Sequence, residues 1–385
     1  MILSYKFKLN TTQEQNTILL DTLNQYKQAI NKPLKYGFKH KQVSGVELHK
    51  ATYYPLREST NLPSQLVCSA RCKATEILKS IKTKTKGKFN TKQPKCHKYT
   101  SIRFDKNSCS ISENMIKVST TSGRIKLPFI SYNLVKDINW NKIQNTCELK
   151  YHPTKKQWFL TVFVDKEPQE TSDTGVLGID RGCKHIAVCS NNKFFNSKHL
   201  RNVKSKYKYL RKRLQSKGTK SAKRLLGKVS RKENRFVRDV NHCISKKIVK
   251  MPFDTFVLEK LQIKKKKKFG KRFNSILSGW SYFQLEQFIK YKAELKNKQV
   301  AYVDARYTSQ KCSNCGHTSR SNRDSQSSFC CKKCEFRLHA DLNASRNIKE
   351  NYIASLGISL TSRAQSIAHT TQSSTRLGSS PVALA

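Results

Sequence analysis

Residues 311–341 read KCSNCGHTSRSNRDSQSSFCCKKCEFRLHAD, a stretch that holds two Cys-x-x-Cys pairs. Cys312 and Cys315 form the first Cys-x-x-Cys motif, and Cys331 and Cys334 form the second. Fifteen residues separate the two motifs. A two-residue gap lets both thiolates of a pair point at one ion, and two pairs complete a tetrahedral zinc site. The alternative is two disulfides or four buried thiols, but no signal peptide opens the chain, so we expect reducing surroundings. The sequence therefore predicts one structural Zn²⁺ ion at this knuckle.

The chain is strongly basic, with 76 Lys and Arg against 25 Asp and Glu and a formal charge of +51 on 385 residues. A protein with this charge repels itself unless a polyanion neutralises it, so nucleic acid is the expected partner. A membrane surface is the rival, yet the chain has no apolar run long enough to span a bilayer. The length and the 37% hydrophobic content predict two or three domains with real cores.

The N-terminal half alternates between strand-like and helix-like patterns. Residues 1–10 alternate apolar and polar side chains, which predicts a half-buried strand. Thr11 and Glu14 have the spacing of a capping box before a helix, and a second helix is expected over 63–81. Short alternating runs between residues 101 and 164 predict a small β-barrel or sheet that the first strand joins.

The C-terminal half starts after a polar stretch, residues 167–174, which we interpret as a linker. Strands are expected at 176–180, 186–189, 256–259 and 300–303, with a helix at 283–295. Residues 201–250 contain nineteen Lys and Arg at helical intervals between apolar residues, which predicts a basic helical hairpin broken near Gly218. A solvated charged face is the ordinary alternative, but such faces mix signs and this one does not. From residue 357 the chain is rich in Ser, Thr and Ala, and we expect a disordered tail.

Three acids occupy positions that a polynucleotide-cutting site requires. Asp180 and Glu259 each end an apolar strand, and Asp341 opens a helix just after the knuckle. Acids at the ends of neighbouring strands, which lie about 4.8 Å apart, can share the two magnesium ions of a phosphodiesterase. The alternative is that each acid is an exposed turn residue or a helix cap, and Asp341 is a plausible cap. Strand, strand and helix in the order of a ribonuclease-H-type fold make catalysis the favoured interpretation.

Four segments together resemble the RuvC-type nuclease core of the TnpB family, transposon-encoded RNA-guided DNA endonucleases. The segments are GIDRG at 178–182, LEKL at 258–261, YTSQKCSNCGH at 307–317 and ADLNASRNI at 340–348. The chain's opening is also similar to the family's N-terminus. The resemblance therefore covers nearly the whole chain except its tail.

The resemblance implies an α+β multidomain fold. Its N-terminal β-barrel, or wedge, has an inserted helical recognition domain and is followed by an RNase H-like α/β RuvC nuclease domain with an inserted zinc ribbon. The implied boundaries are 1–10 and 96–170 for the wedge, 11–95 for the recognition domain, 171–304 and 339–352 for the nuclease, 305–338 for the zinc ribbon that binds target nucleic acid, and 353–385 for the disordered tail.

The resemblance also implies the cofactors, the partners and the residues that bind them. Asp180, Glu259 and Asp341 would hold two catalytic Mg²⁺ ions. One structural Zn²⁺ would be held by Cys312, Cys315, Cys331 and Cys334. Guide RNA and target double-stranded DNA would be the partners, contacted by Arg211, Arg213, Arg231, Arg235, Lys264, Lys265 and Lys266. The lysine run at 264–268 has two further interpretations, a flexible charged loop or a localisation signal.

Two positions depart from the family pattern. Glu335 stands where the family often has Gly after the last knuckle cysteine, and Cys330 lies beside Cys331 and could replace it as the third zinc ligand. Neither position touches the three acids, so an active enzyme is expected.

A guide-RNA enzyme holds an A-form duplex by its backbone, which agrees with long basic tracts. The first alternative is a catalytically silent RNA-guided regulator on the same scaffold. The second is a conventional RNase H-fold transposase, which usually has Glu as its third acid and no knuckle before it. We expect a cytoplasmic, nucleoid-associated protein of a prokaryote, monomeric and not membrane-bound.

Overall fold

A computed structural model describes residues 1–96, 100–130, 138–261, 270, 274 and 281–374. The chain divides into two compact units, Met1–Glu167 and Pro168–Ala385. The division falls at the start of the predicted linker, residues 167–174. Each unit mixes helices with a sheet, and each is described separately below.

The first unit is built on a seven-stranded sheet in which all neighbouring strands are antiparallel. The order is β2-β6-β7-β1-β5-β4-β3. Its strands are β1 Ile2–Leu9, β2 Ser101–Phe104, β3 Cys109–Ile111, β4 Met115–Thr120, β5 Gly123–Ile130, β6 Ile143–His152 and β7 Gln157–Asp165, with short 3₁₀ turns at Trp140–Lys142 and Pro153–Lys155. Because β3 also contacts β6, the sheet curls into a nearly closed barrel. The predicted barrel, and the place of the first strand in it, are confirmed.

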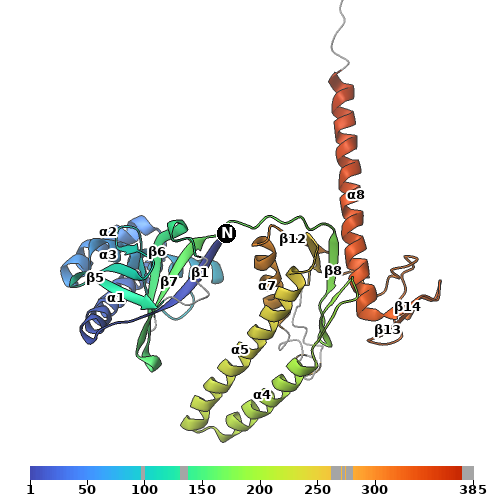
Figure 1. Ribbon diagram of the computed structural model, residues 1–385. Helices are drawn as coiled ribbons and strands as arrows, with labels where there is room; N and C mark the ends of the chain where they lie inside the picture. Colours follow the sequence, from blue (N-terminus) through green and yellow to red (C-terminus); the bar gives the residue numbers. More distant parts are fainter. Residues whose placement is uncertain (97–99, 131–137, 262–269, 271–273, 275–280, 375–385) are drawn as a thin grey trace, which may run out of the picture. The chain divides into compact units, whose positions relative to one another are not determined.

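Three helices, α1 Gln13–Lys39, α2 Gly45–Ser59 and α3 Ser64–Lys84, pack together beside this sheet within the same unit (Figure 1). The capping box predicted at Thr11 and Glu14 is one residue out of place. In the structure Thr12 accepts a hydrogen bond from the Gln15 amide at 3.2 Å and Gln15 accepts one from the Thr12 amide at 3.0 Å. The pattern Thr-x-x-Glu/Gln occurs twice in succession here, so spacing alone does not distinguish the two starts.

Helix α2 was not predicted. Its buried side chains are Leu48, Thr52 and Leu56, which recur every four residues and form one narrow apolar face. A proline at position 55 and a largely polar remainder obscure that face in the sequence. The helix is stabilised by packing against α1 and α3 more than by its own propensity.

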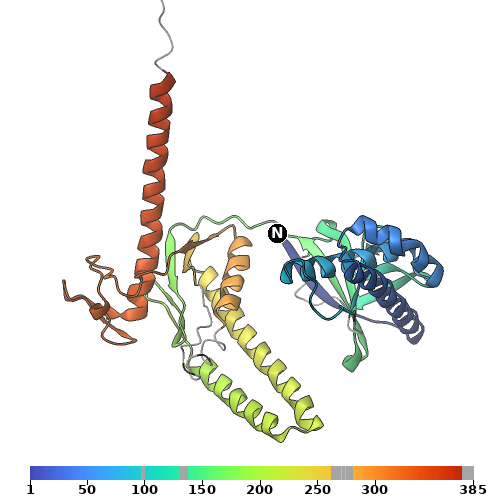
Figure 2. The same cartoon turned by 180° about the vertical axis from the view of Figure 1, so that it is seen from behind.

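The second unit contains a five-stranded sheet of order β10-β9-β8-β11-β12 (Figure 2). Its strands are β8 Val176–Asp180, β9 His185–Cys189, β10 Phe194–Asn196, β11 Thr255–Glu259 and β12 Gln299–Val303. The first three strands are antiparallel, whereas β8, β11 and β12 run parallel. Four of the five strands match the predicted segments. Strand β10 has three residues and a register shift, too little for a period of two to show.

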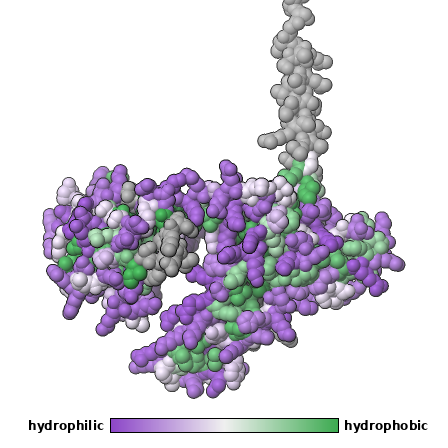
Figure 3. Space-filling view, viewed as in Figure 1, coloured by the Kyte–Doolittle hydropathy of each residue, from purple (hydrophilic) through white to green (hydrophobic). Residues whose placement is uncertain are grey.

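The predicted basic hairpin is present as α4 Lys198–Lys217 and α5 Lys220–Val249. Gly218 ends α4 with a φ of 64°, a left-handed conformation that glycine adopts without strain. The C-terminal part of α5 packs on α7 Tyr282–Glu294, where His242 stacks on Phe288 at a ring distance of 3.8 Å. Hydrophilic side chains cover most of the visible surface, and apolar ones gather along the hairpin (Figure 3).

The knuckle is a small antiparallel pair, β13 Ser328–Cys330 with β14 Arg337–His339, preceded by a 3₁₀ turn at Arg320–Asn322. It leads directly into α8 Ala340–Ser374. The sequence predicted a disordered tail from residue 353, and α8 continues to Ser374. No proline occurs between residues 340 and 380, so proline does not interrupt this helix.

Within the described ranges, no helix combines the length and apolar character that crossing a bilayer requires.

The start of α8 lies unusually close to β8. A Cβ atom added at Gly178 would approach the Ser345 carbonyl oxygen to 2.1 Å and the Lys349 amide nitrogen to 2.7 Å. Real side chains do not approach backbone this closely, so only glycine at position 178 permits this packing. The contact brings the first turn of α8 next to the end of β8, where Asp180 lies.

Candidate functional site

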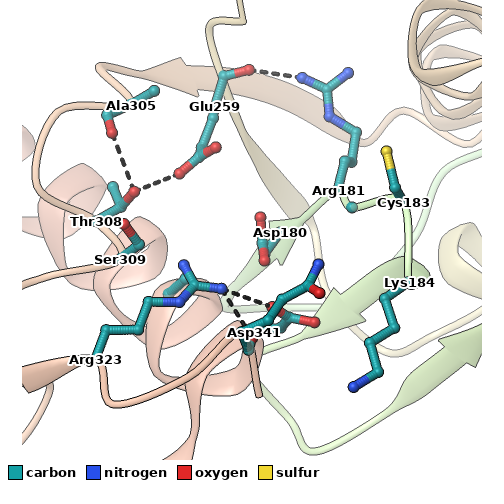
Figure 4. Close-up of a pocket in the computed structure, with 13 residues that line it drawn as sticks. Asp180, Arg181, Cys183, Lys184, Glu259, Ala305, Thr308, Ser309, Arg323 and Asp341 are labelled. Atoms are coloured by element: carbon teal, nitrogen blue, oxygen red, sulfur yellow. Dashed lines mark hydrogen bonds and ion pairs between the residues drawn. The ribbon is translucent and has the colours of Figure 1, made fainter. Parts of the chain in front are cut away.

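Asp180, Glu259 and Asp341 line one cavity of about 270 Å³ in the second unit. Leu258 pairs with Ile179 across the parallel strands β11 and β8, so Glu259 and Asp180 are the next residues on adjacent strands. Asp341 reaches the same cavity from the first turn of α8. In Figure 4, Asp180 lies between the carboxyl groups of Glu259 and Asp341. The structure thus brings together the three acids that the sequence singled out.

The electrostatics of this cavity favour a bound cation. Burial, together with the negative charges of Glu259 and Asp341, raises the pKa of Asp180 well above its usual range. Burial also raises the pKa of Glu259, although hydrogen bonding by Thr308 and the charge of Arg181 oppose this. Carboxylates held together in this way are stabilised when a divalent cation neutralises them.

Each of the outer acids has a fixed hydrogen-bond partner. The Thr308 hydroxyl donates to Oε1 of Glu259, and Arg181 Nη2 donates to the Glu259 main-chain oxygen at 2.6 Å. His185 Nδ1 lies 2.9 Å from Oδ2 of Asp341. These contacts orient the carboxyl groups towards the cavity without neutralising Asp180.

Arg323 is a site residue that the sequence analysis missed. It comes from the segment between the two Cys-x-x-Cys pairs, lines the acidic cavity, and places Nη2 3.6 Å from Oδ1 of Asp341 (Figure 4). Its guanidinium also donates to the carbonyl oxygens of Ser325 and Gln326. One arginine among the many in this chain has no sequence signal that distinguishes it, because its position depends on how the knuckle loop folds.

The four predicted zinc ligands also lie together. The sulfur atoms of Cys312, Cys315, Cys331 and Cys334 are all within 4.8 Å of one another. Cys312 Sγ is 3.7 Å from Cys334 Sγ, and Cys315 Sγ is 3.6 Å from Cys331 Sγ. Hydrogen bonding by the Phe336 amide lowers the pKa of the Cys334 thiol to about 6, which favours the thiolate that zinc binds. The sulfur of Cys330 is not in the group, so the geometry favours Cys331 as the third ligand.

Two buried asparagines of α8 connect the knuckle to the acidic site. The Asn343 side chain donates to the Lys311 carbonyl at 2.8 Å and accepts from the Ser313 amide at 2.9 Å. The Asn347 side chain donates to the carbonyls of Thr308 and Lys311 at 2.8 and 2.6 Å. Each hydrogen bond satisfies a main-chain group that lies outside the regular strands and helices. Together these bonds hold Thr308 and the first knuckle cysteine against the helix that bears Asp341. Both asparagines belong to the segment 340–348 that resembles the family, but only these contacts show what they do.

The predicted nucleic-acid contacts receive different environments. Arg213, Arg231 and Arg235 are exposed on the hairpin, whereas Arg211 is half-buried and forms an ion pair with Glu233 across it. Lys264, Lys265 and Lys266 lie outside the described residues. The structure therefore presents three of the seven predicted basic residues on an open surface.

The donor atoms fit the two kinds of metal that the sequence implied. Carboxylate oxygens around a cavity are the donors that Mg²⁺ prefers, and burial together with the charges of Glu259 and Asp341 raises the pKa of Asp180 there. Four thiols in one cluster are the donors of a closed zinc site. The arrangement suits metal-assisted hydrolysis of a phosphodiester at the cavity, with the zinc serving a structural purpose.

Two family models match the chain, each over part of it. The Cas12f1-like TNB domain model matches residues 282–348, and the OrfB_IS605 model, described as a probable transposase, matches residues 159–269. Together they span the five strands of the second sheet, the hairpin and the knuckle.

Curated relatives match over shorter stretches. The Cas12f1 endodeoxyribonuclease of Sulfoacidibacillus thermotolerans is 46% identical over 79 residues, which are 20% of this chain and 18% of that protein. A TnpB-like protein of Methanocaldococcus jannaschii is 30% identical over 156 residues, 38% of this chain and 54% of that protein. The chain thus spans about half or less of these relatives.

Among solved structures, Cas12f1 in a complex with guide RNA and target DNA has a similar fold. The TM-score is 0.63 at 18% sequence identity, over 88% of this chain and 83% of that one. At this identity the likeness concerns the fold alone.

Proposed function

Because the chain belongs to the TnpB family, we propose that it is an RNA-guided DNA endonuclease of a transposon, which cleaves double-stranded DNA next to a short motif. The observation that carries this proposal is the convergence of Asp180, Glu259 and Asp341 on one cavity. Guide RNA and target DNA are the proposed partners.

The finer fold assignment belongs to the same proposal. The strand order β10-β9-β8-β11-β12, antiparallel and then parallel, supports an RNase H-like nuclease domain with an inserted zinc ribbon. The barrel of the first unit would be the wedge, and helices α1, α2 and α3 would form the recognition part. In this assignment the second unit cuts and the first unit holds RNA and reads the motif.

Asp180, Glu259 and Asp341 would hold the Mg²⁺ ions, which when bound supply an activated water and stabilise the leaving oxygen of the phosphodiester. The chain's own residues prepare the site for this. Thr308 and His185 hold Glu259 and Asp341 in orientation. Arg323 supplies a positive charge at the cavity, where it would bind a phosphate oxygen and position the strand to be cut. The cavity is open to solvent and polar, as a site for an extended, charged strand must be.

Guide dependence is the decisive test. Protein expressed with its native locus should carry a co-purifying RNA and should cut DNA in Mg²⁺ only where the terminal segment of that RNA matches. Reprogramming the segment should move the cut, because base pairing supplies the sequence choice. Asp180→Ala should bind the same DNA without cutting it, since losing one carboxylate unseats a metal but removes no phosphate contact.

Other outcomes would support the two alternatives. Cutting at the same place by RNA-free protein would favour a transposase that selects DNA by itself. Binding of matched DNA without any cutting in Mg²⁺ would favour the silent regulator.

A further inference from the structure

A second group of potential metal ligands lies beside the acidic cavity. His185, His339 and Asp341 each offer a ligand atom, and these atoms are all within 4.8 Å of one another. Neither histidine lines the cavity that Asp180 and Glu259 share. The two histidines are therefore not explained by the proposed magnesium site.

Asp341 presents its two carboxylate oxygens to different neighbours. Oδ2 is 2.9 Å from Nδ1 of His185, whereas Oδ1 is 3.6 Å from Nη2 of Arg323. The Asp341 amide also donates to Nδ1 of His339 at 3.2 Å. His185 therefore lies on the Oδ2 side of the carboxylate, and His339 contacts the main chain of the same residue.

The two imidazoles are held in place by the fold. His185 begins β9 and His339 ends β14, and their rings are 5.1 Å apart at 72° to one another. The ring of Phe194, on β10, lies 5.4 Å from His185 and 5.1 Å from His339. Packing against one aromatic ring restricts both side chains, so the ligands are preorganised at little further entropic cost.

The ligand chemistry selects a kind of ion that differs from magnesium. Mg²⁺ takes oxygen ligands in an octahedral arrangement, whereas imidazole nitrogen suits the later first-row divalent ions. Two histidines and one carboxylate also leave coordination positions for water. The side chains of His185 and Asp341 are 14% and 15% exposed, so a small ion can reach them from solvent.

We propose that His185, His339 and Asp341 form a separate binding site for a late first-row divalent ion such as Co²⁺, Ni²⁺ or Zn²⁺. An ion bound there draws Asp341 towards the histidines and inhibits Mg²⁺-dependent cutting. The inhibition rests on the proposed nuclease function, whereas the binding does not. The positive charge of the Arg323 guanidinium beside Oδ1 of Asp341 repels another cation there, so the ion binds Oδ2 instead.

Binding is tested with Co²⁺ added to the full-length chain, already loaded with zinc at the knuckle and kept in saturating Mg²⁺. Zinc binds such sites more tightly than cobalt, so the knuckle stays zinc-filled. Isothermal titration and the visible absorption of Co²⁺ should show one further ion per chain, without the sulfur bands of a cysteine site. His185→Gln and His339→Gln should each weaken that affinity by about tenfold or more, because even second-shell changes cost 10- to 100-fold.

Two control variants keep the measurement specific. His152→Gln removes an exposed histidine of the first unit, and Glu259→Gln removes a cavity acid outside the histidine group. Both should bind Co²⁺ as the unchanged protein does. Unfolding temperatures of all variants establish that each is folded. If the unchanged chain takes up no Co²⁺ beyond the knuckle, or if both histidine variants bind as tightly as it does, the site does not exist and His185 is only a hydrogen-bond partner of Asp341.

The inhibitory consequence is measured separately, with Zn²⁺ added to guided cutting in saturating Mg²⁺. The Zn²⁺ concentration for half-inhibition should be about tenfold higher in His339→Gln, each variant being compared with its own zinc-free rate. Equal half-inhibition in both proteins would remove the inhibitory role. A chain that never cuts in Mg²⁺ would contradict the proposed function. The Co²⁺ titration would still show whether the histidine site binds an ion.

Discussion

Asp180 is a carboxyl group whose surroundings strongly disfavour its charged form. It lies between two other acids, and its pKa is raised by burial first and by the charges of Glu259 and Asp341 next. Residues in such surroundings are usually functional, because a protein that needed only stability would place an amide or an apolar side chain there. In the proposed function, the site therefore loses stability in the metal-free protein and gains a place for Mg²⁺.

The raised pKa values of Asp180 and Glu259 predict how the stability of the metal-free protein changes with pH. The native pKa values of Asp180 and Glu259 lie above their ordinary ones, so the stability that they contribute is fully present below the ordinary carboxyl range and is lost as pH rises through the raised values. With a chelator present, Asp180→Asn should unfold at a higher temperature than the unchanged protein at neutral pH. The difference should vanish in acid, where Asp180 is protonated. Each pKa unit is worth about 1.4 kcal/mol, and each kcal/mol about 2–4 °C in a domain of this size.

Thermal unfolding followed from pH 4 to pH 8 checks this. Asp239→Asn, at an exposed acid on α5, is the matched control and should show no such gain. A neutral-pH gain that is equally large in acid would mean that charge is not its cause.

At the scale of elements, the site depends on how α8 meets β8. Four of the five strands, the basic hairpin and the three acids are predictable from the sequence, because each rests on a strong local pattern. The contact between Gly178 and Ser345 is not predictable, since a glycine in an apolar strand has several possible reasons. Arg323 is missed for the same cause: its position depends on tertiary packing of the knuckle loop.

Gly178→Ala should therefore damage both fold and activity. The added methyl would meet the Ser345 carbonyl at 2.1 Å, so α8 must move and take Asp341 with it. We expect a loss of stability of about 1–3 kcal/mol and a loss of cutting of about 100-fold, the effect of a 1 Å misplacement. Gly227→Ala in α5 is the control, because nothing lies within 4 Å of its added methyl and a helical alanine stabilises by up to about 1 kcal/mol. Urea unfolding and cutting rates of the pair decide the matter, and an active, stable Gly178→Ala protein would contradict this account.

The knuckle explains one departure from the family pattern. Glu335 has a φ of 56°, a left-handed conformation in which glycine is unstrained. Glu335→Gly should accordingly preserve or raise stability, by up to about 1 kcal/mol. Lys333→Gly, two residues earlier and without a positive φ, should lower it. The rate of zinc loss to a chelator compares the two variants, and equal rates would show that backbone strain at Glu335 is unimportant.

For the whole molecule, the most marked property is its positive charge. The formal charge of +51 is distributed along the chain, and on the hairpin three predicted contact residues are exposed while Arg211 pairs with Glu233. The sequence identified the basic hairpin from its composition but could not separate these two classes, because the separation depends on which residues face each other across α4 and α5. The extent of α8 beyond residue 353 depends on tertiary structure in the same way, because weak periodicity does not exclude a helix that continues from a docked first turn.

The salt dependence of RNA binding should distinguish the two classes of arginine. Replacing Arg213, Arg231 and Arg235 with Gln should reduce the slope of log affinity against log salt by about 0.7 to 0.9 for each phosphate contact removed. Arg211→Gln should leave the slope nearly unchanged and instead lower the unfolding temperature, since its partner is Glu233. Filter binding over a range of salt measures both. An unchanged slope in the triple variant would mean that the hairpin does not contact the RNA backbone.

The late position of Asp341 has a consequence for synthesis. A ribosome releases the barrel, the basic hairpin, Asp180 and Glu259 before the knuckle, and it releases Asp341 after all of them. Under the proposed function, a nascent chain would bind nucleic acid while it still lacks one of its three acids. The proposed active site stays incomplete until the knuckle has emerged, and a product that stops before residue 341 would bind nucleic acid without cutting it.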